Sequence, residues 1–276
     1  MSDAEITLSS EKWVFLLTVS WCCIYVVANT AFQIRLRQLV DNNPLTYPET
    51  LVTKASTFAN YVTSTINSVI AIASTIAFLP VMLSTSFTST NRGVNGPNVA
   101  GTAIIYLSFI AYVIYDTIYE SVLCETPLAD LPIIVHHLLY MVITWLLYVD
   151  QSFPILSFVL FCQELSTPFL NAMQAMKVFS LDTSRAFTVN AWCLTVTFCL
   201  FRVVLPGVAL GHVFLRPPTW DWVRIFIITC VTAGYCMQIF WFSKILKGLL
   251  KHLRAETKTE ETGPLINADI AAGGSQ

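Results

Sequence analysis

Long stretches without a charged residue recur along most of this chain. A helix that crosses a bilayer needs about 20 predominantly apolar residues, and the chain supplies seven such windows. We predict transmembrane helices at about residues 13–34, 58–83, 99–122, 133–149, 153–176, 188–213 and 222–246. Only 12% of the 276 residues are charged, well under the roughly 25% of a soluble domain. This composition predicts an all-α integral membrane protein and excludes a disordered chain and a typical cytosolic enzyme.

The charge balance and the C-terminal composition set further limits. Fifteen basic and 17 acidic residues leave a net charge of −2, so the chain offers no general polycation for a nucleic-acid backbone. Membrane lipids are the expected partners, no nucleic acid is expected, and the sequence names no protein partner. We divide the chain into an N-terminal segment with the first helix (1–49), a transmembrane domain (50–254) and a cytosolic tail (255–276). The tail is expected to be disordered, because its composition buries too little apolar surface.

Basic residues are distributed unevenly between the two sides of the membrane. With seven crossings, one side receives Lys12, Arg92, Arg216 and Arg224. The other side receives ten: Arg35, Arg37, Lys54, Lys177, Arg185, Lys244, Lys247, Lys251, Arg254 and Lys258. Because cytoplasmic loops carry an excess of lysine and arginine, the second side and the C-terminus are expected to be cytosolic.

Polar residues lie inside three successive spans. An ionisable side chain there is unfavourable by about 2.5 kcal/mol or more, so each one needs an explanation. In each span the polar residues follow helical spacing, which places them largely on one face. The third span carries Tyr112, Tyr115, Asp116, Tyr119 and Glu120, the fourth His136, His137, Tyr140 and Thr144, and the fifth Glu164, Thr167, Asn171 and Gln174. We predict that these faces meet around a shared interior, with both histidines about one turn inside the cytosolic surface.

Each of these residues also has a simpler interpretation. Arg202, in the sixth span, could form a buried ion pair with Glu164 or satisfy carbonyl groups freed by Pro206. Asp116 and Glu120 could be carboxylates that reach water at a helix end, and the histidines could be interfacial hydrogen-bonding residues. A stripe in the second span is interpreted as a small-residue packing face: Asn60, Ser64, Asn67, Ala71 and Ser74. The conjunction of histidines, acidic face and deep glutamate favours a functional site.

Several short segments, taken in their order and spacing, resemble one family. They are Tyr115-Asp116, His136-His137, Glu164-Leu165-Ser166-Thr167-Pro168-Phe169-Leu170-Asn171, Phe201-Arg202-Val203-Val204-Leu205-Pro206 and Gln238-Ile239-Phe240-Trp241-Phe242. The family is that of the TLC domain, which includes ceramide synthases, and the resemblance covers roughly residues 50–250. The Glu-Leu-Ser-Thr-Pro-Phe block is closer to the small TLC domain-containing lipid-homeostasis proteins. The resemblance implies a ring of helices around an interior cavity that admits an acyl chain, and an endoplasmic-reticulum location.

The chain departs from ceramide synthases at one motif. Those enzymes carry a His-Asp pair and a further aspartate after the paired histidines, where this chain has Gln163, Glu164 and Thr167. The difference argues against acylation of a sphingoid base and leaves acyl transfer to another acceptor open.

Two classes of function remain open at this point, with a seven-span receptor or transporter as a weaker third. As an enzyme, the chain would transfer an acyl group from acyl-CoA as co-substrate, with no cofactor and no metal. Its catalytic candidates are His137, His136, Glu164 and Asp116, and its lipid-binding candidates are Glu120, Tyr140, Thr144, Thr167, Asn171 and Arg202. As a non-catalytic regulator, it would bind lipid headgroups with the same residues. Of the two histidines, His137 shares a helical face with Tyr140 and Thr144, which makes it the better candidate for a general base.

Overall fold

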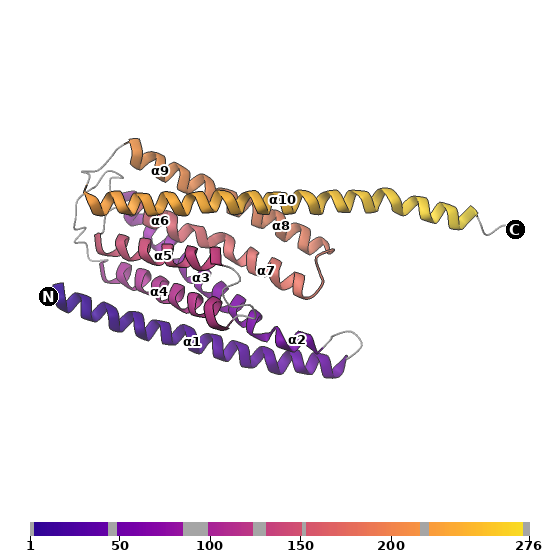
Figure 1. The fold of residues 1–276 in the computed structure, drawn as a ribbon, viewed down its shortest axis with the longest axis horizontal. Helices are drawn as coiled ribbons and strands as arrows, with labels where there is room; N and C mark the ends of the chain where they lie inside the picture. The colour runs from indigo at the N-terminus through magenta and orange to yellow at the C-terminus, as the bar shows by residue number, and fades with distance from the viewer. Residues whose placement is uncertain are drawn as a thin grey trace.

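The computed structural model describes residues 3–43, 49–84, 99–123, 131–150, 153–215 and 221–272. Within these ranges the chain is helical and contains no strand. The helices lie side by side in one elongated bundle (Figure 1). Its elements are α1 (Asp3–Asn42), α2 (Thr50–Thr53), α3 (Ala55–Ser84), α4 (Val99–Ile118), η1 (Tyr119–Leu123), α5 (Leu131–Asp150), α6 (Pro154–Cys162), η2 (Gln163–Ser166), α7 (Thr167–Val178), α8 (Arg185–Phe198), η3 (Cys199–Val204), α9 (Leu205–Leu215) and α10 (Trp222–Ala272).

The elements combine into long rods that match the predicted spans. α6, η2 and α7 follow one another without a break, as do α8, η3 and α9. Successive rods run in opposite directions, and the two ends of the chain lie at opposite ends of the bundle (Figure 1). Every predicted span therefore has its helix, and the all-α integral membrane fold is confirmed.

The packing of the rods closes into a ring. α1 packs against α3 and α4, α4 against α5, and α5 against α10. α10 then packs against α8, α8 against α7, and α7 against α3, which completes the circuit. The polar side chains described below lie on the inner sides of this ring.

Within the described residues, six rods are long and apolar enough to cross a membrane by length and composition. They cover Lys12–Asn42, Ala103–Val122, Leu131–Val149, Ile155–Val178, Arg185–Leu215 and Trp222–Arg254. The described part of α3, the second predicted span, is not among them, and the whole helix of 30 residues would extend about 45 Å. Its described part carries buried polar side chains, including Asn60, Asn67 and Ser68, which lower its mean hydropathy. α3 is thus a long helix whose polar face turns into the bundle.

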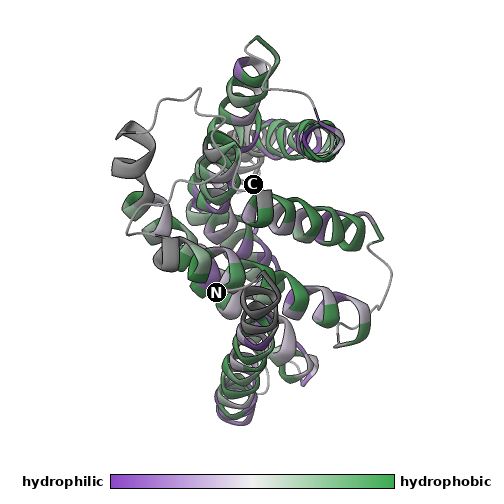
Figure 2. Ribbon diagram, turned by 90° about the vertical axis from the view of Figure 1, so that its left-hand side faces the viewer, coloured by the Kyte–Doolittle hydropathy of each residue, from purple (hydrophilic) through white to green (hydrophobic). Residues whose placement is uncertain are grey.

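The outward faces of the bundle suit a hydrocarbon surrounding. Large apolar side chains are exposed there, such as Phe15, Val208 and Phe226. Hydrophobic residues dominate the helices when the bundle is viewed from one end (Figure 2). A soluble protein rarely exposes so much contiguous apolar surface, so this distribution is what a membrane-embedded bundle requires.

Two neighbouring rods depart from α-helical geometry, and in each case the departure precedes a proline. η2 is a 3-10 helix that ends just before Thr167 and Pro168, and η3 is a π-helix that ends just before Pro206. Because proline has no N–H, Pro168 and Pro206 leave the carbonyls of Glu164 and Arg202 without their usual helical partners. Local 3-10 and π geometry compensates for such losses in membrane helices. Glu164 and Arg202 therefore lie where the backbone is irregular.

The structure differs from the sequence-based expectation at the C-terminus. α10 continues as a helix to Ala272 and extends well beyond the ends of the other rods (Figure 1), where the composition predicts a disordered tail. A helix satisfies its backbone hydrogen bonds within itself, and the four alanines and three glutamates from position 255 favour it. Helical structure there does not require a hydrophobic core.

Removing the tail is expected to leave the bundle intact. Deletion of residues 257–276 removes only the part of α10 that projects past the other helices (Figure 1). We expect the truncated protein to match the full chain in folded yield and melting temperature in detergent. A truncated protein that aggregates or melts several degrees lower would show that the tail packs against the bundle.

Candidate functional site

The paired histidines lie on α5, and one of them contacts an acidic residue of α4. Nε2 of His137 is 3.3 Å from Oδ2 of Asp116, and the two side chains are only 14% and 13% exposed. His137 is six residues from the start of α5, which puts it about 9 Å inside the helix end. Of the three carboxylates on the predicted polar faces, Asp116, Glu120 and Glu164, it is Asp116 that the structure places beside this imidazole.

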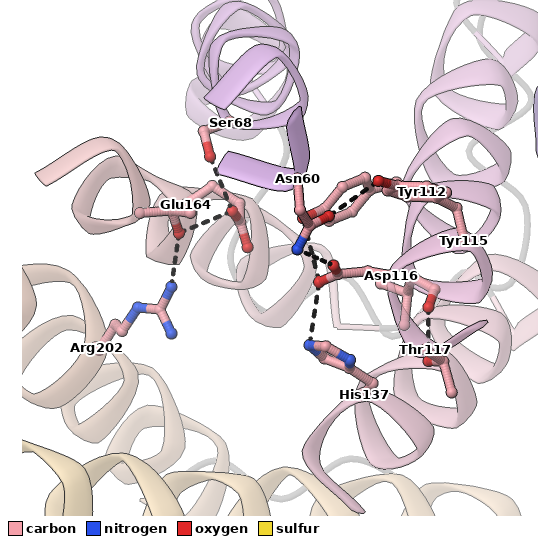
Figure 3. A network of polar contacts seen from close by, with 11 residues as sticks. Asn60, Ser68, Tyr112, Tyr115, Asp116, Thr117, His137, Glu164 and Arg202 are labelled. Atoms are coloured by element: carbon pink, nitrogen blue, oxygen red, sulfur yellow. Dashed lines mark hydrogen bonds and ion pairs between the residues drawn. The ribbon is translucent and has the colours of Figure 1, made fainter. Parts of the chain in front are cut away.

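Asp116 is held by neighbours on two helices (Figure 3). The Tyr112 hydroxyl donates to Oδ2 at 3.2 Å, and the Asn60 amide, from α3, donates to Oδ1 at 3.3 Å. Tyr115 in turn donates its hydroxyl to Oδ1 of Asn60 at 2.9 Å. These contacts fix the orientation of the carboxylate before it meets the imidazole. We call these residues, with His137, the Asp116 cluster.

The position of Asp116 determines which nitrogen of His137 is free. A carboxylate only accepts hydrogen bonds, so it favours the imidazole tautomer that carries its hydrogen on Nε2. Nδ1 then presents a lone pair, and it is buried with no hydrogen-bond partner among the described residues. An imidazole oriented by a carboxylate at one nitrogen and free at the other is the arrangement of a general base.

His136 has a different environment. Its ring packs against Tyr140, with centroids 4.1 Å apart, and edge-on against Trp241 of α10, with centroids 4.8 Å apart. Its Nδ1 also has no partner in the part of the chain that the structure describes. His136 thus sits in an aromatic setting that joins α5 to α10, whereas His137 meets a carboxylate.

Glu164 and Arg202 do not form the direct ion pair that is one of the two interpretations of Arg202 from the sequence. Instead Thr167 lies between them, since its hydroxyl donates to Oε2 of Glu164 at 3.0 Å and accepts from Nη2 of Arg202 at 2.9 Å. Ser68 of α3 also donates to Oε2 of Glu164 at 3.2 Å. Figure 3 shows Ser68, Glu164 and Arg202 on one side and the Asp116 cluster on the other. The reason for the correction is that Thr167 lies one turn beyond Glu164 on the same rod and intervenes.

Arg202 is bound mainly to the irregular backbone of the neighbouring rod. Its Nε donates to the carbonyl of Gln163 at 3.0 Å and to the hydroxyl of Ser166 at 2.7 Å. Its guanidinium carbon also lies 5.2 Å from the centre of the Phe198 ring. The simpler interpretation of Arg202, as a residue that satisfies backbone carbonyls, is thus the better description, although the carbonyl belongs to η2 beside Pro168.

Tyr140 belongs to a third group of polar side chains between α5, η2 and α10. Its hydroxyl donates to Oε1 of Gln163 and accepts from Nε2 of Gln238, the latter at 2.8 Å. All three residues border a cavity of about 30 Å³, which is room for about one water molecule. Oε1 of Gln238 is buried without a partner among the described residues. This cavity is far too small for the acyl chain that the family resemblance implies.

The remaining predicted residues lie outside these contacts. Thr144 is fully buried and donates to the carbonyl of Tyr140, one turn back on its own helix. The Asn171 amide donates to the Tyr61 carbonyl and the Thr65 hydroxyl, both at 3.1 Å, and so fastens α7 to α3. Glu120 is half-buried in η1 and does not contact His137.

Several residues that organise the site are not among those predicted from the sequence. Asn60 and Ser68 of α3 contact the two carboxylates, Asp116 and Glu164, although the polar stripe of this helix was interpreted as packing. Gln163 and Gln238 were noted only as parts of motifs. The available signal was the position of Asn60 and Ser68 two turns apart in a span without charges, since an amide or hydroxyl there needs a partner.

The described side chains offer groups for acid–base chemistry. Within the described ranges, no three or more His, Cys, Asp or Glu side chains are placed to hold a metal ion. Among the buried groups that have no partner in the described part of the chain are the Nδ1 atoms of His136 and His137 and Oε1 of Gln238. They offer lone pairs to a hydroxyl or amine proton.

Fold and site together define a polytopic membrane protein whose helical ring encloses a histidine–aspartate pair. The TLC domain profile matches residues 58–247, from α3 to α10. The chain belongs to the TLC domain family.

One similar protein is TLC domain-containing protein 4 A of Dictyostelium discoideum. It is 25% identical over 163 residues, which is 56% of this chain and 62% of the relative. This agrees with the expected likeness to the small TLC domain-containing proteins. No solved structure matches the chain significantly.

Proposed function

We propose that this protein acts in lipid homeostasis by transferring an acyl group from a thioester donor, acyl-CoA, to a membrane lipid. The observation that carries the proposal is the contact between His137 and Asp116, with Nδ1 of His137 left free. A base of this kind typically contributes about 10²–10⁴-fold to a rate. No cofactor takes part.

The transfer would proceed in balanced steps around His137. Nδ1 accepts the proton of the acceptor's hydroxyl or amine as its oxygen or nitrogen attacks the thioester carbonyl carbon. The carbon–sulfur bond then breaks, and the imidazolium returns the proton to the leaving thiolate. Asp116 stabilises the imidazolium that forms between these steps. The acceptor lipid supplies the nucleophile, so no covalent acyl-enzyme is required.

The other predicted residues would act indirectly, by holding the helices around His137 in place. Arg202 and Thr167 hold η2 in place and leave Glu164 beside Ser68. Tyr140 packs against His136 and fixes the side of α5 that faces α10. These contacts keep the α5 backbone, and with it His137, in register with Asp116.

The location and orientation are part of the same proposal. Acyl-CoA is a water-soluble donor, and the basic residues at the His137 end of the bundle favour a cytosolic position for that end. We place the protein in the endoplasmic reticulum with its C-terminus in the cytosol. A glycosylation site fused to the C-terminus should stay unmodified, and its modification would overturn the orientation.

The proposal is tested with purified full-length protein in phospholipid vesicles. Radiolabelled palmitoyl-CoA is added together with a lysophospholipid, and lipids are separated to find the label. We expect label in a diacyl phospholipid at a rate that depends on protein amount. Label that stays in the thioester for every lipid acceptor offered would overturn catalysis.

One observation favours a non-catalytic lipid regulator as the second candidate. The cavity beside Tyr140 and Gln238 has a volume of only about 30 Å³, which leaves little room for an acyl chain within the ring. Under this alternative the polar interior would bind a headgroup. Cells that lack the protein would then change their lipid composition, although the purified protein transfers no label.

A further inference from the structure

A groove of about 580 Å³ lies between α1, α4 and α5, apart from the polar interior. α1 contributes Val14, Phe15 and Thr18, and the α5 wall includes Val142 and Trp145. The Thr18 hydroxyl already donates to the carbonyl of Val14 at 2.8 Å. The lining is otherwise made of apolar and aromatic side chains. The groove is therefore suited to a hydrocarbon ligand.

The groove exists because α1 packs tightly along only part of its length. From Trp21 onward, α1 is fastened to α4, with the Trp21 ring 5.4 Å from that of Tyr112 and Tyr25 5.6 Å from Tyr119. From Lys12 to Ser20, the side chains of α1 are exposed or half-buried, and Phe15 is 68% exposed. The open part of α1 forms one side of the groove, and α5 forms the other.

The surroundings of the groove identify the kind of ligand. All three of its helices are long and apolar enough to cross a membrane, so the groove opens onto hydrocarbon. α1 precedes the residues that match the TLC domain, 58–247, so the groove lies where the N-terminal helix meets that domain. It is thus a separate site from the His137 site proposed for acyl transfer.

We propose that this groove binds one acyl chain of a membrane phospholipid. Its volume lies within the roughly 300–1,000 Å³ of small-molecule sites. The α5 residues that line the groove run from Met141 to Leu146, which corresponds to about 8 Å along the helix axis. A second helix would pack over a much longer stretch, since stable protein interfaces bury about 800 Å² per partner. An acyl chain, which is slender and flexible, fits the short groove.

The test uses the full chain in nanodiscs that contain phosphatidylcholine with a photoreactive diazirine on one acyl chain. After illumination and digestion, mass spectrometry locates the attached lipid. Val142→Trp fills the groove from the α5 side, and attachment to the α1 peptide around Phe15 is measured. Val208→Trp, at an exposed position of α9, is the matched control.

In the unmodified protein we expect severalfold more attachment to the groove helices than to exposed parts of α9. Val142→Trp should lower attachment to the α1 peptide severalfold, and Val208→Trp should not. If Val142→Trp does not fold, Thr18→Trp fills the groove from the other side, and attachment to α5 is measured. Even attachment over all lipid-facing helices, or no change in the groove variant, would overturn the proposal.

Discussion

Replacing His137 with alanine is expected to lower acyl transfer by the purified protein by about 10²-fold or more, the contribution of a general base. Among the described residues, the imidazole makes one polar contact, to Asp116, and α5 is held by packing against α4 and α10. The variant should therefore fold and insert like the unmodified chain. The measurement is the rate of label transfer from palmitoyl-CoA, normalised to folded protein.

Two companion variants separate base catalysis from a packing effect. Asp116→Asn places an amide beside Nε2, and an amide that donates there favours the tautomer with hydrogen on Nδ1. This variant should lose nearly as much rate as His137→Ala, although its side chain has the same size. His136→Ala should be milder, because His136 contacts Tyr140 and Trp241 and no carboxylate. Equal, small losses in all three variants would contradict a base at His137.

Replacing Arg202 with glutamine is expected to destabilise the fold by about 3–5 kcal/mol, as when one partner of a buried charged network is removed. Arg202 is buried and donates to Gln163, Ser166 and Thr167. Its loss leaves these acceptors without a donor and Glu164 without a nearby positive charge. The folded fraction in detergent, followed against temperature, gives the measurement.

Glu164→Gln provides the matched comparison for Arg202. The amide oxygen can still accept from Ser68 and Thr167, so this variant should lose less stability than Arg202→Gln. The double variant should lose less stability than the sum of the two single losses, because both charges are then removed. An Arg202→Gln protein as stable as the unmodified chain would show that the contacts of Arg202 contribute nothing to stability. If the stability loss of the double variant equals the sum of the two single losses, Glu164 and Arg202 are not coupled through Thr167.

The fold was largely predictable because long uncharged windows leave few alternatives in a membrane. The windows locate every rod of the bundle, and helical spacing assigns His137 and Asp116 to polar faces that the structure brings together. The tail is where the two differ, because the composition indicates disorder and the structure continues α10 to Ala272.

The contacts between helices could not be derived in the same way. Spacing along a helix defines a face, but it does not define the distance between two side chains on different helices. Glu164 and Arg202 lie on neighbouring rods, yet Thr167 intervenes between them. The polar face of α3 was assigned to packing because amides and hydroxyls serve both purposes. Only the packed structure reveals that Asn60 contacts Asp116 and that Ser68 contacts Glu164.

The most direct test of the central claim compares lipid profiles of cells that lack this protein after each variant is restored at equal abundance. The unmodified chain and, in large part, His136→Ala should restore the normal acyl composition of membrane lipids. His137→Ala should leave the profile of the deficient cells unchanged. If His137→Ala restores the profile as well as the unmodified chain, the catalytic role of the His137–Asp116 pair is contradicted.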